Sequence, residues 1–305
     1  MKLTHFRDLL AVVQTGSLRA ASRQLGIAQP VITRSIRELE HELGTPLLER
    51  NAKGVSLTPV GERFVRRIEA VRAEIRRARE EVDQWGGDYV GEVAISVSPM
   101  VSLTLLPWAV TEFNRRHPKA VTNITQSLFR PIENQLAEGL LDFWIGTVDE
   151  SAVSQRFSVE TLLPHNRRVA ARPNHPLLGA KSLTELAGAS WVRPSLDDRT
   201  VTTDVEEAFQ RLGIPPPNVA VQSPSMLVMV QIVANSDLLT MLPEEIFELM
   251  PLERFCVPLE FIPPMPAAPV CIVHRQGLPL TPLAENLSDL MRKAAHNYLR
   301  GKNSK

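Results

Sequence analysis

The first residues of the chain place apolar side chains at helical spacing. Leu3, Phe6, Leu10 and Val13 recur every three or four positions, and the pattern stops at Gly16. This spacing predicts an amphipathic helix that buries one face and ends at the glycine.

Two further helices, separated by a glycine turn, are predicted next. Ser17 is a good N-cap for a short second helix, and Gly26 allows the left-handed turn that closes it. Pro30 fits the first turn of a third helix, which ends at Gly44. The apolar face of this third helix comprises Ile32, Ile36, Leu39 and Leu43.

The opposite face of the third helix is polar and basic. Pro30, Arg34, Arg37 and His41 lie on it, and Gln29 and Thr33 flank it. A glycine turn before a helix that presents Gln, Thr and Arg outward is typical of a DNA-binding helix-turn-helix. Gln29 and Arg34 are the candidates for base edges, because amide and guanidinium groups make bidentate contacts to adenine or guanine. The alternative is a solvated face whose arginines pair with Glu38 or Glu42.

Residues 46–57 read as a β-hairpin with a basic tip. Strands are predicted at 47–48 and 55–57, with a turn between Asn51 and Gly54. A basic wing beside a recognition helix contacts phosphates or the minor groove. The predicted phosphate or groove contacts are Ser17, Arg19, Thr33, Arg37, Arg50 and Lys53.

A long helix is predicted from the capping residue Thr58 to about Trp85, where Gly86 and Gly87 end it. Its apolar positions follow the spacing of a coiled-coil seam. Such a stripe packs on its own domain or on a second copy of the chain, and its length favours pairing. The seam consists of Val60, Phe64, Ile68, Val71, Ile75, Ala78, Val82 and Trp85.

After Gly91 the pattern changes to strands that alternate with helices, which predicts parallel βαβ units. The first series has strands at 93–97, 121–125 and 143–146 and helices at 103–116 and 132–138. The second has strands at 169–171, 191–193, 219–222 and 238–241 and helices at 202–212, 226–234 and 244–249. A strand at 269–274 and a helix at 283–299 return to complete the lobe formed by the first series. The chain then passes between the two lobes twice, and these two strand crossings form a hinge.

The predicted fold class is therefore an α-helical winged helix-turn-helix, a long linker helix and a two-lobed α/β domain. The DNA-binding domain covers residues 1–58, the linker helix 59–87 and the effector-binding domain 88–305. Lobe I comprises residues 88–163 and 266–305, and lobe II comprises residues 164–265.

Hydroxyl and amide groups recur where the predicted strands end. Ligands of open α/β sheets bind at the carboxyl ends of strands, where helix N-termini also point donors at anions. These hydroxyl groups and helix ends predict a small organic anion as the ligand. No buried-looking arginine in the sequence indicates that the ligand must be a dicarboxylate. The alternative is that each Ser or Thr is an ordinary helix cap. The candidate effector-binding residues are Ser98, Met100, Ser102, Gln126, Phe129, Thr147, Thr202, Ser225 and Met226.

Charge distribution strengthens the nucleic-acid prediction. The 305 residues have no net charge. Residues 1–85, however, hold 15 basic and 11 acidic side chains, so the head carries +4 and the remainder −4. A basic head favours a polyanionic partner for that part alone.

Other classes of protein are disfavoured. No apolar run is long enough for a membrane span or a signal peptide, so we expect a cytoplasmic protein. The sequence shows no glycine-rich phosphate loop, no Gly-x-Ser-x-Gly turn and no metal-ligand spacing, so neither an enzyme nor a cofactor is predicted. An α/β enzyme or solute-binding protein is one alternative; a redox-sensing regulator using Cys256 and Cys271 is another.

Residues 3–61 resemble the DNA-binding domain of LysR-type transcriptional regulators, and residues 91–299 are similar to their effector domain. The resemblance implies a homodimer paired through the linker helix, a homotetramer, and an effector that changes DNA bending and RNA polymerase recruitment. The chain departs from the family pattern at Ala28, Leu48, Asn235 and Asp237. The matching pieces are Gly16-Ser17-Leu18, Ala20-Ala21, Leu25, Gln29-Pro30, Ile36, Leu39-Glu40, Leu43-Gly44, Leu47, Arg50, Leu57-Thr58-Pro59-Val60-Gly61, Leu105-Leu106-Pro107, Leu141-Asp142-Phe143, His175-Pro176-Leu177 and Leu242-Pro243.

Overall fold

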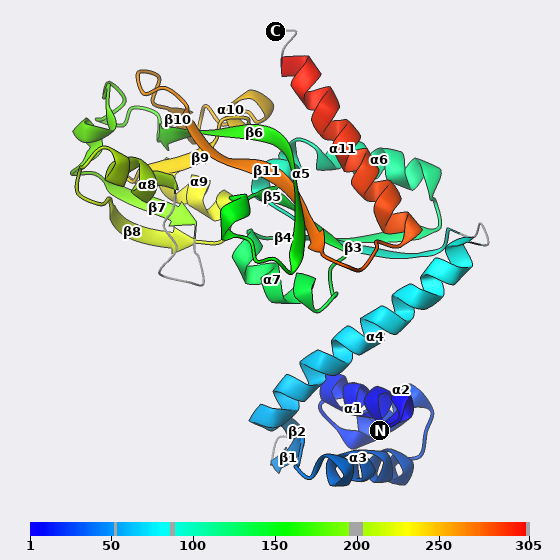
Figure 1. Ribbon diagram of the computed structural model, residues 1–305. Helices are drawn as coiled ribbons and strands as arrows, with labels where there is room; N and C mark the ends of the chain where they lie inside the picture. The colour runs from blue at the N-terminus through cyan, green and yellow to red at the C-terminus, as the bar shows by residue number, and fades with distance from the viewer. Residues whose placement is uncertain (52–53, 86–88, 195–203, 303–305) are drawn as a thin grey trace. The chain divides into compact units, whose positions relative to one another are not determined.

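The computed structural model describes residues 1–51, 54–85, 89–194 and 204–302 (Figure 1). The chain forms two compact units: residues 1–79 with 138–140, and residues 80–137 with 141–305. Among the described residues, no helix has the length and apolar character needed to cross a membrane.

The N-terminal unit is a three-helix group with a β-hairpin and the first part of a long helix. Gly16 and Gly26 adopt positive φ angles of 69° and 65° and end the first two helices, as predicted. The Ser17 hydroxyl caps the second helix by accepting a hydrogen bond from the Ala20 N–H. The elements are α1 (Leu3–Thr15), α2 (Leu18–Leu25), α3 (Gln29–Leu43), β1 (Leu48–Asn51), β2 (Gly54–Leu57) and α4 (Pro59–Trp85).

The predicted apolar face of α3 packs inward. Ile32, Ile36 and Leu39 are buried against α1 and the surrounding elements. Because a helix repeats every 3.6 residues, burying this face directs the polar face of α3 to solvent. Ala28 occupies the N-cap of α3 and has no side chain that can cap it.

The N-terminus of α4 lies close to the start of the hairpin. The Thr58 hydroxyl accepts a hydrogen bond from the Gly61 N–H at 2.9 Å and so caps α4. The Thr58 N–H donates to the Leu47 carbonyl at 2.9 Å. A Cβ at Gly61 would overlap that same carbonyl oxygen, so only glycine permits this approach.

The apolar stripe of α4 is covered along only part of its length. Phe64 and Ile68 pack into the core of the N-terminal unit. Val60, Val71 and Val82 are exposed, Val82 by 71%. Part of the apolar stripe therefore packs into the N-terminal unit, and apolar positions farther along α4 remain exposed to solvent.

Lobe I contains a parallel sheet with helices on both faces. Strands β4, β3 and β5 are adjacent and parallel. Helices α6 and α11 cover one face, and α7 covers the other. The elements are β3 (Gly91–Val97), α5 (Pro99–Leu103), α6 (Leu106–Arg116), β4 (Ala120–Gln126), α7 (Phe129–Ala137), β5 (Phe143–Thr147), a short 3₁₀ turn (Glu150–Ala152) and α11 (Pro282–Lys302).

Lobe II is built around a second, smaller sheet and the ends of two long strands. Strands β7 and β8 are parallel, and the long β6 pairs with β9 and β10. The elements are a 3₁₀ turn (Leu183–Leu186), β7 (Ser190–Pro194), α8 (Asp204–Arg211), β8 (Asn218–Ser223), α9 (Met226–Ala234), β9 (Thr240–Pro243), α10 (Ile246–Leu249) and β10 (Val257–Pro258).

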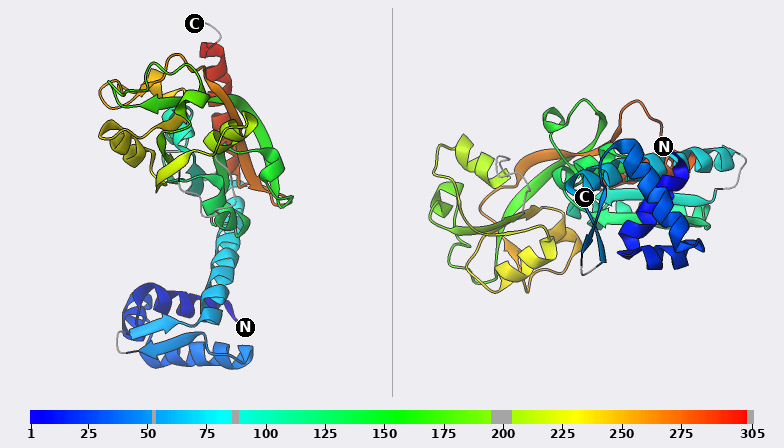
Figure 2. Two further views of the ribbon diagram at one scale, coloured as in Figure 1. Left: turned by 90° about the vertical axis from the view of Figure 1, so that its left-hand side faces the viewer. Right: turned by 90° about the horizontal axis from the view of Figure 1, so that it is seen from below.

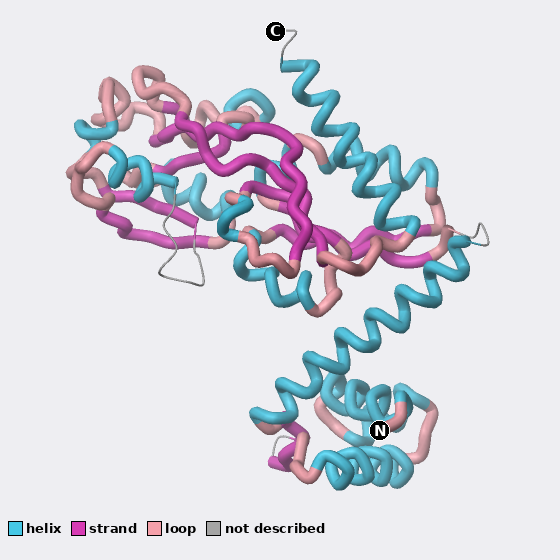
Figure 3. The backbone as a smooth tube through the Cα atoms, in the orientation of Figure 1, coloured by secondary structure: helices cyan, strands magenta, loops and turns pink. Residues whose placement is uncertain are grey.

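Two antiparallel strands, β6 (Phe157–Ala171) and β11 (Met265–Arg275), connect the lobes. Figures 2 and 3 show them running side by side through the domain. At one end β11 also pairs with β5 of lobe I; at the other, β6 pairs with β9 and β10 of lobe II. These strands are the two crossings that the sequence predicted.

The fold class is confirmed, and two element predictions need correction. The helix expected at 103–116 begins only at Leu106 as α6, with Pro107 in its first turn, and a separate short helix, α5, precedes it at Pro99–Leu103. The strand expected at 169–171 is part of a strand that begins at Phe157. Pro164 and the polar residues beside it hide the alternating pattern of a strand in this segment. Its strand conformation is instead fixed by pairing with β11.

Replacing Gly61 with alanine should destabilise the N-terminal unit by about 1–3 kcal/mol, because the new methyl group overlaps the Leu47 carbonyl. Hydrogen–deuterium exchange over residues 3–57 would measure the loss. Gly301→Ala is the matched control, since the α11 glycine has no neighbouring atom within 4 Å of an added Cβ. It should be neutral or stabilising by up to about 1 kcal/mol. Equal exchange in both variants would contradict the packing argument.

Candidate functional site

The outward face of α3 forms a shallow, polar surface. Gln29, Pro30, Arg34 and Arg37 are exposed and Thr33 is half-buried. The residues that line this surface are Gln29, Pro30, Thr33, Arg34, Arg37, Glu38 and His41. The structure therefore brings together the predicted base-contacting residues and two of the predicted phosphate contacts.

Arg34 is held in an ion pair on this surface. Its Nε donates to Glu38 Oε1 at 2.7 Å, which is the pairing that the solvated-face alternative expected. This hydrogen bond lowers the pKa of the Glu38 carboxyl below its ordinary value, so Glu38 stays ionised. An exposed ion pair of this kind contributes little stability, and a base edge can replace the carboxylate as the partner of Arg34.

A second groove lies between α3, α2 and the hairpin. Arg37 lines both this groove and the outward surface of α3. The groove-lining residues are Leu18, Thr33, Ile36, Arg37, Glu40, Leu48 and Val55.

Glu40 fixes the hairpin relative to α3. Its Oε1 accepts hydrogen bonds from the Leu47 and Leu48 N–H groups at 2.8 and 3.1 Å. The Val55 N–H on the other strand donates to the Gly16 carbonyl at 3.1 Å. Glu40 is thus a positioning residue that the sequence interpretation recognised only as part of a family motif.

The remaining predicted DNA contacts are distributed differently. Ser17 uses its hydroxyl to cap α2, and Arg19 is exposed on the same helix. The Arg50 side chain and all of Lys53 lie outside the described residues.

A cavity with a free volume of about 50 Å³ lies at the carboxyl ends of the lobe I strands. Five of the predicted effector residues line it, namely Ser98, Met100, Gln126, Thr147 and Met226. The other described lining residues are Pro99, Ser127, Leu128, Arg167, Pro194, Pro224, Met229, Met241, Leu242 and Pro243.

Ser98, Gln126 and Thr147 reach the wall from neighbouring strands. Val97, which precedes Ser98, pairs with Gln126 of β4, while the Ser98 N–H donates to the Ile145 carbonyl of β5 at 2.8 Å. Ser98 is 2% exposed, and within the described chain its hydroxyl has no hydrogen-bond partner. A buried hydroxyl of this kind is normally satisfied, so the Ser98 hydroxyl is available to a bound molecule.

Three predicted residues lie behind the wall, and one cannot be placed. Phe129, a candidate effector-binding residue, packs against Trp144 in the core beneath α7 and does not line the cavity. The Ser102 hydroxyl donates to the Pro99 carbonyl and accepts from Gln126 Nε2. Ser225 caps α9 by accepting from the Val228 N–H. Thr202 lies outside the described residues.

Several wall residues were not identified from the sequence. Arg167, on β6, lines the cavity, although the sequence pattern did not indicate it. Met229 and Met241 join Met226 on the lobe II side. The carboxyl end of the strand at 238–241 could have indicated Met241, but Arg167 depends on β6, whose length the sequence pattern hides.

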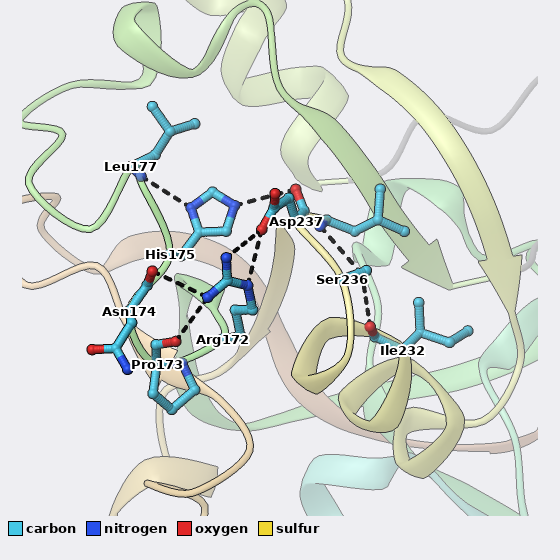
Figure 4. A network of polar contacts seen from close by, with 9 residues as sticks. Arg172, Pro173, Asn174, His175, Leu177, Ile232, Ser236 and Asp237 are labelled. Atoms are coloured by element: carbon cyan, nitrogen blue, oxygen red, sulfur yellow. Dashed lines mark hydrogen bonds and ion pairs between the residues drawn. The ribbon is translucent and has the colours of Figure 1, made fainter.

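A network of polar contacts holds the turn between α9 and β9 to the chain that follows β6 (Figure 4). Arg172, after β6, forms an ion pair with Asp237 at 2.7 Å and donates to the Pro173 and Asn174 carbonyls. The Leu177 N–H donates to His175 Nδ1. His175 Nε2 therefore carries the hydrogen that it shares with the Asp237 carbonyl at 3.2 Å. Asp237, one of the departures from the family pattern, anchors the turn before β9.

Comparison with known proteins identifies both units. Residues 3–62 match the model of the bacterial regulatory helix-turn-helix protein, lysR family, and residues 86–296 match the LysR substrate binding domain. The HTH-type transcriptional regulator TdcA of Escherichia coli K12 is 26% identical over 79% of this chain and 77% of its own. The SDS degradation transcriptional activation protein of a Pseudomonas species is 27% identical over 95% of both chains.

Solved structures share the fold over nearly the whole chain. CbnR, a LysR family transcriptional regulator, aligns with a TM-score of 0.70 at 18% identity and covers 97% of this chain and 99% of its own. CbnR in complex with its target DNA has the same TM-score at 17% identity over 96% of this chain and 100% of its own. The family models together span most of the sequence, so the chain belongs to the LysR family and is a LysR-type transcriptional regulator with a helix-turn-helix and a substrate-binding domain.

Proposed function

We propose that this regulator binds promoter DNA through α3 and the hairpin, and that a small organic anion in the cavity of residues 80–305 modulates the binding. The observation that carries the proposal is the buried, unpartnered hydroxyl of Ser98 at the ends of parallel strands. Membership of the LysR family confirms that the chain is a regulator rather than an enzyme. A promoter partner places its action in the cytoplasm.

In the proposed DNA complex, α3 lies in the major groove. Gln29 and Arg34 then face base edges, and Arg37, at the junction of the two surfaces, faces the phosphates. Support comes from the exposure of these side chains on a helix whose apolar face is fixed in the core. CbnR, which shares the fold, has been solved with its target DNA.

Pairing of two copies through α4 completes the proposal. Val71 and Val82 are exposed apolar positions of the predicted seam, and a helix from a second copy would cover them. A dimer presents two recognition helices to two half-sites. We further propose that dimers associate into tetramers and act on RNA polymerase, as the family resemblance implies.

Arg34→Ala should weaken binding to a DNA sequence selected by the wild-type chain by about 1–3 kcal/mol, because one bidentate base contact is lost. Binding to random duplex should change much less. Fluorescence anisotropy at fixed salt measures both. Arg115→Ala, which removes an exposed arginine paired with Glu112 outside the DNA-binding unit, is the control and should alter neither affinity. Equal losses on both DNAs would rule out base reading by Arg34.

Ser98→Ala should preserve DNA binding and reduce the response to small acids by about tenfold or more, since a hydrogen bond to a charged group is removed. The readout is the change in DNA affinity caused by whichever carboxylate of a screened panel raises the wild-type melting temperature. Ser96→Ala is the matched control: its hydroxyl is also buried and unpartnered within the described chain, yet it does not line the cavity. A full response in Ser98→Ala would contradict the proposed site.

The redox alternative meets a physical obstacle. Cys256 and Cys271 are both buried and free. Burial raises the pKa of Cys256 to about 12 and also raises the pKa of Cys271. Because the thiolate is the reactive form, both thiols are poor redox sensors at neutral pH.

At pH 8 the native chain should therefore resist alkylation by iodoacetamide at both cysteines, and peroxide should leave DNA binding unchanged. The folded thiols have raised pKa values, so their stabilising effect is complete below the ordinary thiol pKa of about 8.5. The free energy of unfolding should fall as pH rises above that value, because only the unfolded chain then ionises. Mass spectrometry of labelled protein provides the measurement, and rapid native labelling would restore the redox alternative.

A further inference from the structure

The polar part of the cavity wall lies on lobe I and on the crossing strand β6. Ser98, Gln126 and Thr147 stand at the ends of β3, β4 and β5. Arg167 is the single charged side chain among the described residues of the wall. This side therefore offers hydroxyl and amide groups and a positive charge to one anionic group.

The opposite part of the wall is apolar. Met226 and Met229 come from α9, and Met241 and Leu242 come from β9. Met100 of α5 adds a thioether on the lobe I side, beside Ser98. Thioethers and aliphatic groups pack well on a hydrocarbon but supply no donor for a second carboxylate. Among the described residues of this apolar side there is no cation, so a second charge placed against them would lose its water without gaining a partner.

The size of the cavity restricts the ligand. Its free volume of about 50 Å³ is smaller than the roughly 150 Å³ of an engineered apolar cavity that takes up benzene. Flexible methionine side chains can enlarge the cavity by the volume of a few atoms, but not enough to take up a large ligand.

We propose that the effector is a compact monocarboxylate with a short apolar tail. Its carboxylate lies toward Ser98 and Arg167, and its tail lies among the methionines of lobe II. This inference rests on the proposed effector function of the cavity and adds the chemical class of the ligand. Met226, which is half-buried at the start of α9, selects against a second charge.

Isothermal titration calorimetry on the full chain with matched acids tests the proposal. Butyrate and succinate have four carbons with one and two carboxylates, and hexanoate and adipate repeat the comparison with six. Each monocarboxylate should bind about tenfold or more tightly than its dicarboxylate, because the second carboxylate is desolvated without a partner. Butyramide, which has the same tail without the charge, should bind more weakly than butyrate.

A charge placed at the apolar end gives a positive test. Met226→Lys should reverse the preference and favour succinate over butyrate, while Met226→Gln, of similar length and without charge, should not favour succinate. Circular dichroism shows whether each variant is folded. A folded Met226→Lys protein that still prefers butyrate would overturn the placement of the tail.

Other outcomes separate this inference from the function on which it rests. If succinate binds wild-type chain as tightly as butyrate, or if none of these acids binds while another small molecule alters DNA affinity, the ligand class is wrong and the effector function stands. If no molecule in a broad metabolite screen binds the chain or alters DNA affinity, both fail.

Discussion

The antiparallel pairing of β6 with β11 is the constraint on which the effector domain depends. This pairing joins the two lobes. It also places Arg167 of β6 in the cavity wall. The two strands pair on both sides of an irregularity at residues 267–271, so the connection is an ordered ladder rather than a flexible linker. A ligand that touches Ser98 in lobe I and Met226 in lobe II can change the relation of the lobes only by binding one arrangement more tightly than another.

In the N-terminal unit, the helical period of α3 puts its core-packing residues on one face and its proposed DNA-contacting residues on the other. Burial of Ile32, Ile36 and Leu39 directs Arg34 and Arg37 outward without any further device. The hairpin needs specific anchoring, which Glu40 supplies by accepting two backbone N–H groups. The residues that we propose to contact DNA thus stand on a rigid element, which keeps the entropy lost on binding small.

Local signals made the DNA-binding unit readable from sequence. Caps at Ser17 and Thr58 and the helical period depend on neighbours a few residues away, so the helices and hairpin were predicted well. The Ser98 strand end was placed by the same kind of local rule. Arg167 was missed because its position follows from pairing with residues about 100 positions distant, which no local pattern reveals. Phe129 was misplaced because the start of α7 could face either the cavity or the core, and packing on Trp144 decided it.

The network around Asp237 indicates how the cavity can communicate with the rest of the domain. Arg172 and His175 hold the turn between α9 and β9 to the chain that follows β6. Met226 and Met241 lie on the two elements that this turn joins, so the same contacts link both elements to the chain that follows β6. If an effector binds as we propose, any shift of the lobe II wall is expected to involve both of these elements together. Such a shift would reach lobe I through β6 and β11, because these two strands connect the lobes.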